Sequence, residues 1–224
     1  MRNIIMTLVL TLSVGAVSAQ SAIPRDAKIE AKIENILSKM TLDEKIGQML
    51  QLNLDIFGKY DNAGNWEINE TILDTCMAKY KVGSILNAPS RAATIEQWQR
   101  WIPLIQKMSM KHMGIPDLYG LDQNHGSTYT QGGTLFPQPI NLGASFNTEL
   151  VREGAEITAY ESRASNCPWV FNPVVDLGRD PRWPRIYESF GEDAIVNARM
   201  VEAEIKGYQG DDPNHLGKYN VGTS

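Results

Sequence analysis

The sequence predicts an α/β fold with a parallel sheet, of the (β/α)₈ barrel type. Segments of buried-strand type alternate with amphipathic helical segments along most of the 224 residues, a pattern typical of parallel βα units. A doubly wound sheet is the other common arrangement, but no G-x-G-x-x-G turn or P-loop follows a predicted strand. About four βα units can be counted, whereas a closed barrel needs eight and typically about 250 residues. We therefore expect the N-terminal portion of a barrel, truncated part-way round.

The N-terminal residues have the pattern of a secretory signal peptide. One arginine precedes an apolar run that ends in Val17-Ser18-Ala19, and these side chains suit a signal peptidase. The run is short for a membrane span, although an N-terminal anchor is the alternative. We therefore expect residues 1–19 to be a signal peptide and residues 20–224 to be exported, either to the periplasm or outside the cell. No other membrane contact is expected.

Charge and cysteine content narrow the class of protein. The net charge is −5 and no basic stripe is present, which argues against a nucleic-acid partner. Cys76 and Cys167 could pair in an oxidising compartment. However, Cys76 shares a helical pattern with Leu73 and Met77, which favours a buried core thiol. No cysteine or histidine spacing suggests zinc, so we expect no metal.

Two helices are predicted before the first strand. An apolar stripe at helical spacing follows Pro24 and consists of Ile29, Ile33, Ile36, Leu37 and Met40. The second helix opens at TLDE, where Thr41 and Glu44 have the spacing of a capping box. We expect Ile46, Met49 and Leu50 to form its buried side. An apolar run follows, and then residues 57–69, whose glycine, asparagine and aspartate content predicts a loop.

Helices and strands then alternate regularly. The predicted elements are a helix at 70–80, a strand at 82–87, a helix from about 90 to 113, a strand at 118–124, a loop at 134–147, a helix at 147–164, a strand at 167–178 and a helix at 192–210. Gly114 and Pro116 are the stop signals of the second of these helices. In the last helix, Ile195, Val201 and Ile205 are expected to face inward.

Functional side chains of a barrel lie at the carboxyl ends of its strands and in the loops that follow. Asp122 ends one predicted strand, and Arg179 directly follows another. The guanidinium group offers a fork of donors and the carboxylate accepts from paired hydroxyls, so together they predict a site for a polyol. Each also has a plainer interpretation. Asp122 could cap a turn, and His125 could be a structural histidine.

The segment GRDPRWPRIYESFGED at 178–193 also has two interpretations. Its charged side chains are Arg179, Asp180, Arg182, Arg185, Glu188, Glu192 and Asp193. On local pattern alone, most of them form an ion-pair network that ties the loop to the barrel.

At these residues the chain resembles glycoside hydrolase family 3, the β-glucosidase, β-xylosidase and glucan exohydrolase group. The motifs, in order, are MTLDEKIGQML, GIPDLYGLDQNHG, TLFPQPINLGASFN and NPVVDLGRDPRWPRIYESFGED. The resemblance implies an exo-acting, retaining enzyme of β-glucosidase type that removes terminal non-reducing sugars from β-linked glycans. It implies that Asp122 and Arg179 bind the terminal sugar. Pro184, where the family usually has glycine, and Gln123-Asn124, where a small apolar pair is common, depart from the pattern.

The resemblance also implies that the catalytic carboxylates are missing from this chain. A retaining glycosidase needs a nucleophile and an acid/base about 5–5.5 Å apart. In the family the nucleophile lies in a later S-D-W or G-D-W motif, and a Lys-His pair follows the strand that begins near KYNVGTS; neither occurs here. We therefore expect an inactive N-terminal part of the enzyme, with no catalytic residue of its own. The resemblance also implies no cofactor, because this mechanism needs only carboxylates and water.

Two alternatives stay open. The chain could be a non-catalytic carbohydrate-binding or orphan fragment of such an enzyme, although the unpaired strand edges of an open half-barrel favour aggregation. It could also belong to the β-xylosidase branch or the N-acetylglucosaminidase branch. YESFGED is closer to the glucosidase and xylosidase branches than to the N-acetylglucosaminidase branch. The sequence does not specify the sugar, the linkage or the oligomeric state.

Overall fold

The computed structural model describes residues 25–89, 91–212 and 214–224, which belong to two compact units, 1–40 and 41–224. The predicted signal peptide lies outside the described residues. Within those residues, no helix combines the length and the apolar character needed to cross a membrane.

The described part of the first unit contains helix α1, Ala27–Leu37. Asp26 caps it by accepting hydrogen bonds from the amides of Lys28 and Ile29. The predicted apolar stripe is present, but Ile29 and Ile33 are exposed and no residue of α1 is buried. The periodicity therefore predicted the helix correctly.

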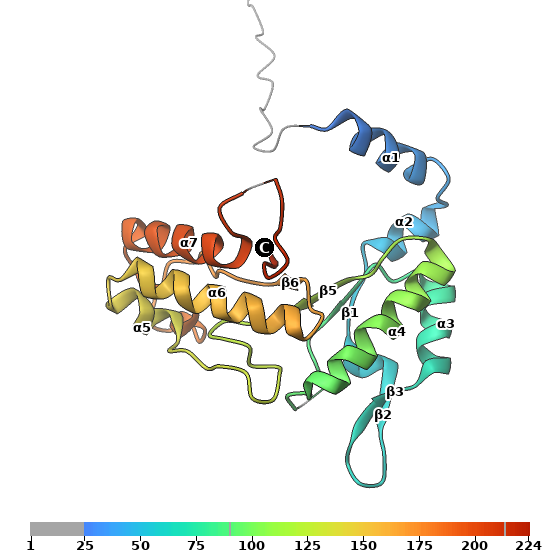
Figure 1. Cartoon of the computed structure of the whole chain (residues 1–224), viewed down its shortest axis with the longest axis horizontal. Helices are drawn as coiled ribbons and strands as arrows, with labels where there is room; N and C mark the ends of the chain where they lie inside the picture. The colour runs from blue at the N-terminus through green and yellow to red at the C-terminus, as the bar shows by residue number, and fades with distance from the viewer. Residues whose placement is uncertain (1–24, 90, 213) are drawn as a thin grey trace, which may run out of the picture. The chain divides into compact units, whose positions relative to one another are not determined.

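Five short parallel strands form the sheet of the second unit (Figure 1). They are β1 Gln51–Asn53, β4 Ser84–Leu86, β5 Leu118–Leu121, β6 Trp169–Val170 and β7 Gly222–Thr223, and they pair in this order. Each strand pairs with the strand of this sheet that follows it along the chain. A doubly wound sheet would instead reverse its strand order at a switch point. The sequential order confirms the predicted part of a (β/α)₈ barrel.

Helices precede and connect the strands of this sheet, as predicted. They are α2 Leu42–Gln48, α3 Glu70–Tyr80, α4 Ile95–Met113, α5 Pro139–Ala144, α6 Thr148–Ala164 and α7 Ala194–Gln209, with short 3₁₀ turns η1 Leu54–Phe57 and η2 Ile186–Glu188. Two predicted boundaries are wrong. The expected loop at 134–147 contains α5, and the expected strand at 167–178 pairs only over β6. Pro168 and Pro173 flank β6 and have no N–H to donate to a ladder.

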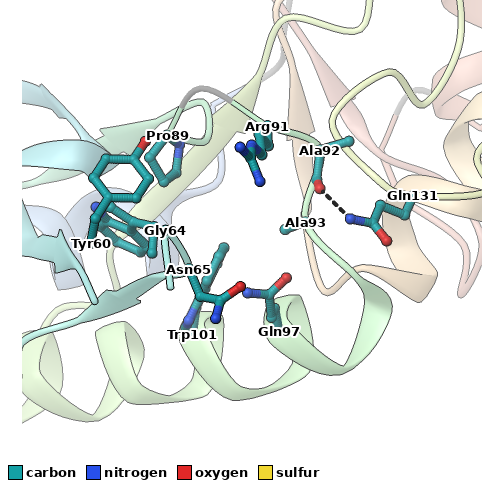
Figure 2. A pocket seen from close by; sticks show the side chains of 11 residues that line it. Tyr60, Gly64, Asn65, Pro89, Arg91, Ala92, Ala93, Gln97, Trp101 and Gln131 are labelled. Carbon is teal, nitrogen blue, oxygen red and sulfur yellow. Dashed lines mark hydrogen bonds between the residues drawn. The ribbon is translucent and has the colours of Figure 1, made fainter. Parts of the chain in front are cut away.

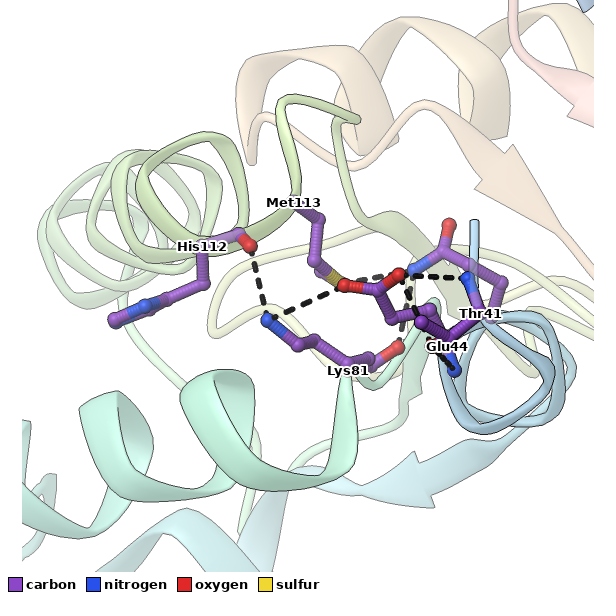
Figure 3. A network of polar contacts seen from close by, with 6 residues as sticks. Thr41, Glu44, Lys81, His112 and Met113 are labelled. Carbon is purple, nitrogen blue, oxygen red and sulfur yellow. Dashed lines mark hydrogen bonds and ion pairs between the residues drawn. The ribbon is translucent and has the colours of Figure 1, made fainter. Parts of the chain in front are cut away.

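The capping box of α2 is present, but its predicted buried side is wrong. Thr41 accepts a hydrogen bond from the amide of Glu44, whose carboxylate accepts one in return from the amide of Thr41 (Figure 3). Ile46 and Met49 are 57% and 86% exposed. The residue that packs inward is Gly47, where a Cβ would lie 2.1 Å from the carbonyl oxygen of Tyr80. α2 therefore packs against the end of α3 through close backbone contact at Gly47 and not through burial of its apolar side chains.

Lys81 joins three helices at the opposite end of the sheet from the strands' carboxyl ends. It ends α3 in a left-handed conformation, with φ 54°. Its Nζ donates to the carbonyl of His112 in α4 at 3.2 Å and lies 3.8 Å from the carboxylate of Glu44 in α2 (Figure 3). Gln48 donates to the Lys81 carbonyl at 3.0 Å. These contacts hold the first βα unit to the second.

Residues 57–69 form a β-hairpin and not the plain loop that was predicted. β2 Gly58–Tyr60 pairs antiparallel with β3 Trp66–Ile68. Asp61 starts the turn by accepting from the amides of Ala63 and Asn65 at 2.9 and 2.8 Å, and Gly64 adopts φ 81°. The residue types that predicted a loop therefore form the turn.

The main core lies between the first strands and helices α3 and α4. Its centre is a series of edge-to-face aromatic pairs that joins Trp66, Trp101, Trp98 and Tyr119, with ring centroids 5.0, 5.4 and 5.8 Å apart. Such pairs stabilise a core beyond the area they bury. Because Trp66 lies on β3, this series also anchors the hairpin to α4.

Helices α6 and α7 pack side by side on the later strands (Figure 1). The expected inward residues of α7 are right only in part: Ile195 is 75% exposed, whereas Ile205 is partly buried and Val201 is partly buried and packs against a core cluster. The buried residues of α7 are Asn197, Met200, Glu204, Gly207 and Tyr208. Because the buried face includes an amide and a carboxyl group, a stripe chosen by apolar side chains alone does not identify it fully.

Both cysteines are free thiols in the structure. Cys167 is fully buried, and burial raises its pKa to about 12. Cys76 is partly buried and packs against the main core, where burial also raises its pKa. The predicted core thiol at Cys76 is thus at the edge of the core.

Candidate functional site

The candidate site lies where the carboxyl ends of β4, β5 and β6 meet. Asp122 directly follows β5, and Asn87 directly follows β4 in a left-handed conformation that asparagine tolerates, with φ 57°. Asn87 Nδ2 donates to Asp122 Oδ2 at 2.9 Å, and Asn87 Oδ1 accepts from the Asp122 amide at 3.1 Å. This pair of hydrogen bonds fixes the carboxylate at the strand end.

A buried hydroxyl group hydrogen-bonds to the backbone of Asn87. Tyr119, fully buried on β5, donates from its hydroxyl to the carbonyl of Asn87. Asn87 bonds one oxygen of the Asp122 carboxylate, and the Asp122 side chain is partly exposed to solvent. A pre-positioned carboxylate of this kind can accept hydrogen bonds from vicinal hydroxyls.

The loop after Asp122 is anchored side chain by side chain. Gln123 is buried and donates to Ser162 Oγ in α6 at 3.2 Å. Asn124 Nδ2 donates to Glu188 Oε2 at 3.1 Å. His125 Nδ1 lies 2.9 Å from the Phe136 carbonyl. The Gln123-Asn124 pair therefore makes specific polar contacts, and His125 fits its structural interpretation.

A bidentate ion pair from the charged segment reaches the same strand ends. Arg185 Nε donates to Glu188 Oε1 at 2.8 Å, and its terminal nitrogen donates to Oε2 at 2.5 Å. Hydrogen bonding by Arg185 is the main cause that lowers the pKa of Glu188. In turn, Glu188 and, to a lesser degree, the nearby charge of Asp122 raise the pKa of Arg185. The guanidinium group of Arg185 therefore lies within the electrostatic reach of Asp122.

Arg179 has a different position. Its side chain is exposed and its Nε donates to the backbone carbonyl of Glu192 at 3.5 Å. Its charge also helps to lower the pKa of Asp193, after the two helix amides that Asp193 caps. Among the described residues no hydrogen bond or ion pair joins Arg179 to Asp122. The structure thus places both predicted residues after neighbouring strands without bringing them into contact.

The charged segment acts in part as the predicted brace. The Arg185–Glu188 pair ties η2 to the loop after β5 through Asn124. Arg182 pairs with the exposed carboxylate of Asp180, and no other ion pair of Arg182 occurs in the described part of the chain. Sequence reasoning missed Asn87 as a site residue and assigned Arg185 to bracing alone. The spacing of Asn87 at the end of a predicted strand was the available signal, because carboxyl ends of parallel strands share one edge.

A small, partly open cavity of about 20 Å³ lies beside the loop after β5. Asn124, His125 and Gly126 line one side, and Glu204 and Tyr208 of α7 line the other. Tyr208 donates its hydroxyl to Glu204 Oε1 at 3.1 Å, whereas Oε2 is buried with no partner among the described residues. Burial raises the pKa of Glu204 to about 8. A cavity of this size and polarity can hold one water molecule.

No cluster of three or more histidine, cysteine or acidic side chains suited to a metal ion occurs among the described residues. The groups at the strand ends are carboxylates, amides and a guanidinium group, which recognise hydroxyl-rich ligands through hydrogen bonds. Such groups at the carboxyl edge of part of a parallel barrel are suited to a hydroxyl-rich ligand.

The chain belongs to glycosyl hydrolase family 3. The model of the glycosyl hydrolase family 3 N terminal domain matches residues 41–223. The lysosomal beta glucosidase of Dictyostelium discoideum is 38% identical over 84% of this chain and 24% of its own length. The periplasmic beta-glucosidase of Salmonella typhimurium is 35% identical over 87% of this chain and 22% of its own.

Solved structures agree with the family assignment. The exo-1,3/1,4-beta-glucanase from a Pseudoalteromonas species superposes with a TM-score of 0.75 at 32% identity, over 91% of this chain and 25% of that one. The beta-glucosidase from Listeria innocua in complex with glucose superposes with a TM-score of 0.65 at 33% identity, over 87% and 26%. The chain thus spans about a quarter of the length of these relatives.

Proposed function

We propose that this chain is the N-terminal part of the barrel of an exo-acting, retaining β-glycosidase, with β-glucosidase as the first choice. Its substrates are the terminal non-reducing sugars of β-linked oligosaccharides and polysaccharides. The observation that carries the proposal is Asp122, held by two hydrogen bonds with Asn87 at the carboxyl edge of the sheet and close enough to Arg185 for its charge to act on that guanidinium group. Relatives named as β-glucosidases support the choice of sugar.

In this proposal Asp122 accepts hydrogen bonds from two adjacent hydroxyls of the terminal sugar. Arg185 donates to a neighbouring hydroxyl, while Glu188 keeps its guanidinium group oriented. Arg179 is proposed as a second arginine contact, which needs its side chain to leave the Glu192 carbonyl. Retaining hydrolysis also needs a nucleophile and an acid/base. We assign neither role to a carboxylate of this chain, so the chemistry belongs to other segments of the enzyme.

We also propose export. The signal-peptide pattern at 1–19 and two relatives named periplasmic support it. A β-xylosidase is the second candidate, because a putative beta-xylosidase of Formosa agariphila is 30% identical over 81% of this chain. A non-catalytic carbohydrate-binding role is the third, since the residues of the candidate site bind sugar without performing chemistry.

The first test is to read the coding sequence beyond the codon for Ser224 and to express the complete enzyme. Aryl β-glucosides, β-xylosides and N-acetyl-β-glucosaminides then identify the sugar. We expect Asp122→Asn to lower kcat/KM by roughly a hundredfold, the value of about two charge-assisted hydrogen bonds. The control Asp43→Asn, an exposed change in α2, should have no effect. Unchanged kinetics of a folded Asp122→Asn enzyme would contradict the site.

The two arginines can be distinguished in the same enzyme. Lysine keeps the charge but loses the planar fork of donors. Arg185→Lys should lower kcat/KM if the guanidinium group of Arg185 contacts the sugar. Arg179→Lys should lower kcat/KM if the guanidinium group of Arg179 contacts the sugar. Thermal unfolding of each variant separates a loss of sugar contact from a loss of bracing.

A further inference from the structure

A second pocket opens beside the hairpin, at the same edge of the sheet as Asp122. It has a volume of about 100 Å³ and is lined by Tyr60, Gly64, Asn65, Trp66, Pro89, Arg91, Ala92, Ala93, Gln97, Trp101 and Gln131 (Figure 2). These residues come from three segments that follow the carboxyl ends of β1, β4 and β5. In a (β/α) barrel this is the edge that binds substrate.

The pocket is connected to the candidate site through two loops that pair with each other. One loop starts at Asn87, which holds Asp122, and reaches Ala93. The other starts at Asp122 and reaches Gln131. Ala93 donates its amide to the Tyr129 carbonyl at 2.9 Å, and the Gln131 amide donates to the Ala93 carbonyl at 2.8 Å. The inner ends of these loops thus form the candidate site, and their outer ends form a wall of the pocket.

The pocket combines an aromatic wall with convergent polar groups. Tyr60 lines the pocket and is 49% exposed, and the buried edge-to-face pair of Trp66 and Trp101 also lines it. Asn65 and Gln97 point toward one another across the pocket, and Arg91 points into it (Figure 2). Aromatic surface with a few placed hydrogen-bonding groups is typical of a small-molecule site.

Several of these groups are pre-positioned. Asn65 donates to Asp61 Oδ2 at 3.2 Å, and Gln97 accepts from the Thr94 amide at 3.0 Å. Gln131 donates to the Ala92 carbonyl at 3.0 Å. By contrast, the guanidinium group of Arg91 makes no hydrogen bond or ion pair with the described residues, so its donors are available to a ligand.

We infer that this pocket is an outer subsite, which binds a more distant sugar ring of a β-linked oligosaccharide whose terminal sugar lies at Asp122. The ring packs on Tyr60, while Arg91, Asn65 and Gln97 bond its hydroxyls. The identity of this ligand rests on the proposed function, because the same glycan chain must reach both sites. The small volume accepts part of one ring, which suits a subsite and not a whole-ligand pocket.

Two measurements on the complete enzyme test the inference. The first is the equilibrium affinity of thio-linked cello- and laminari-oligosaccharides of two to six units, which the enzyme does not hydrolyse, measured by calorimetric titration. Tyr60→Ala and Arg91→Ala should each weaken binding of the longer oligosaccharides by about tenfold. Neither should change binding of the monosaccharide. The matched control is Lys59→Ala, an exposed change on the same hairpin that does not line the pocket.

The second measurement is kcat/KM for an aryl β-glucoside and for each oligosaccharide. We expect both variants to leave aryl glucoside hydrolysis unchanged and to remove the gain in kcat/KM with chain length. If wild-type enzyme cleaves the aryl glucoside but Tyr60→Ala binds every oligosaccharide normally, the subsite is overturned and the proposed function stands. If no aryl glycoside is cleaved, the proposed function fails, and the binding titration alone decides the subsite.

Discussion

The buried carboxyl group of Glu204 gives the sharpest test of the energetics of this fold. It lies on the inward face of α7, with one oxygen bonded by Tyr208 and the other without a partner among the described residues. Burial raises its pKa from 4.5 to about 8. We expect Glu204→Gln, which keeps the shape and removes the ionisation, to change how stability depends on pH.

The direction follows from proton binding. Between pH 4.5 and pH 8 the folded state keeps the proton of Glu204, whereas the unfolded state releases it. The free energy of unfolding of the wild-type protein therefore falls as pH rises through this window. The full change in the pKa of Glu204 from 4.5 to about 8 corresponds to about 5 kcal/mol. A water molecule in the adjoining cavity can solvate the ionised oxygen of Glu204. We therefore expect the free energy of unfolding to fall by about half of this value.

Urea unfolding at pH 5, 7 and 9, followed by tryptophan fluorescence, measures the effect. At pH 5 the variant should match the wild type to within about 1 kcal/mol, the cost of one imperfect buried hydrogen bond. At pH 9 the variant should be more stable by about 2–3 kcal/mol. The control is Glu202→Gln on the same helix, whose half-exposed side chain pairs with Lys206 and should leave the slope above pH 5 unchanged. Equal pH profiles for Glu204→Gln and wild type would refute the reasoning.

Three further predictions concern stability and are read from the same unfolding curves. Gly47→Ala should destabilise by about 1–3 kcal/mol or more, because its Cβ would meet the Tyr80 carbonyl at 2.1 Å; wild-type stability would show that α2 can shift freely. Ile105→Ala should cost about 2–5 kcal/mol because the side chain is fully buried, whereas Ile33→Ala in α1, 45% exposed, should cost under about 1 kcal/mol; similar losses would contradict the assigned core. Asp117→Asn should be stabilising above pH 7 and nearly neutral below pH 4, since burial raises the pKa of Asp117 to about 7; a loss of stability at pH 9 would count against this.

Features that depend on neighbouring residues were predictable from the sequence. The capping box of Thr41 and Glu44 spans three residues, and Gly114 ends α4 in the left-handed conformation that glycine favours. The alternation of helices and strands predicted a parallel sheet, and its sequential strand order confirms the barrel type. Asp122 could likewise be placed at a strand end. Each of these properties follows from local hydrogen bonding or from the period of the apolar pattern.

Contacts between separate βα units were decided only by the tertiary structure. Asn87 reaches Asp122 across 35 residues, and Asn124 reaches Glu188 across 64. No local pattern specifies such pairs, because they depend on which strand ends become neighbours and on how the following loops bend. The tertiary structure also decided which face of each helix is buried. In α2, Gly47 faces inward because the backbones approach closely there, whereas Ile46 is exposed. The sequence therefore determined the order of the elements and which residues end the strands, while packing between units decided which of those residues form a site.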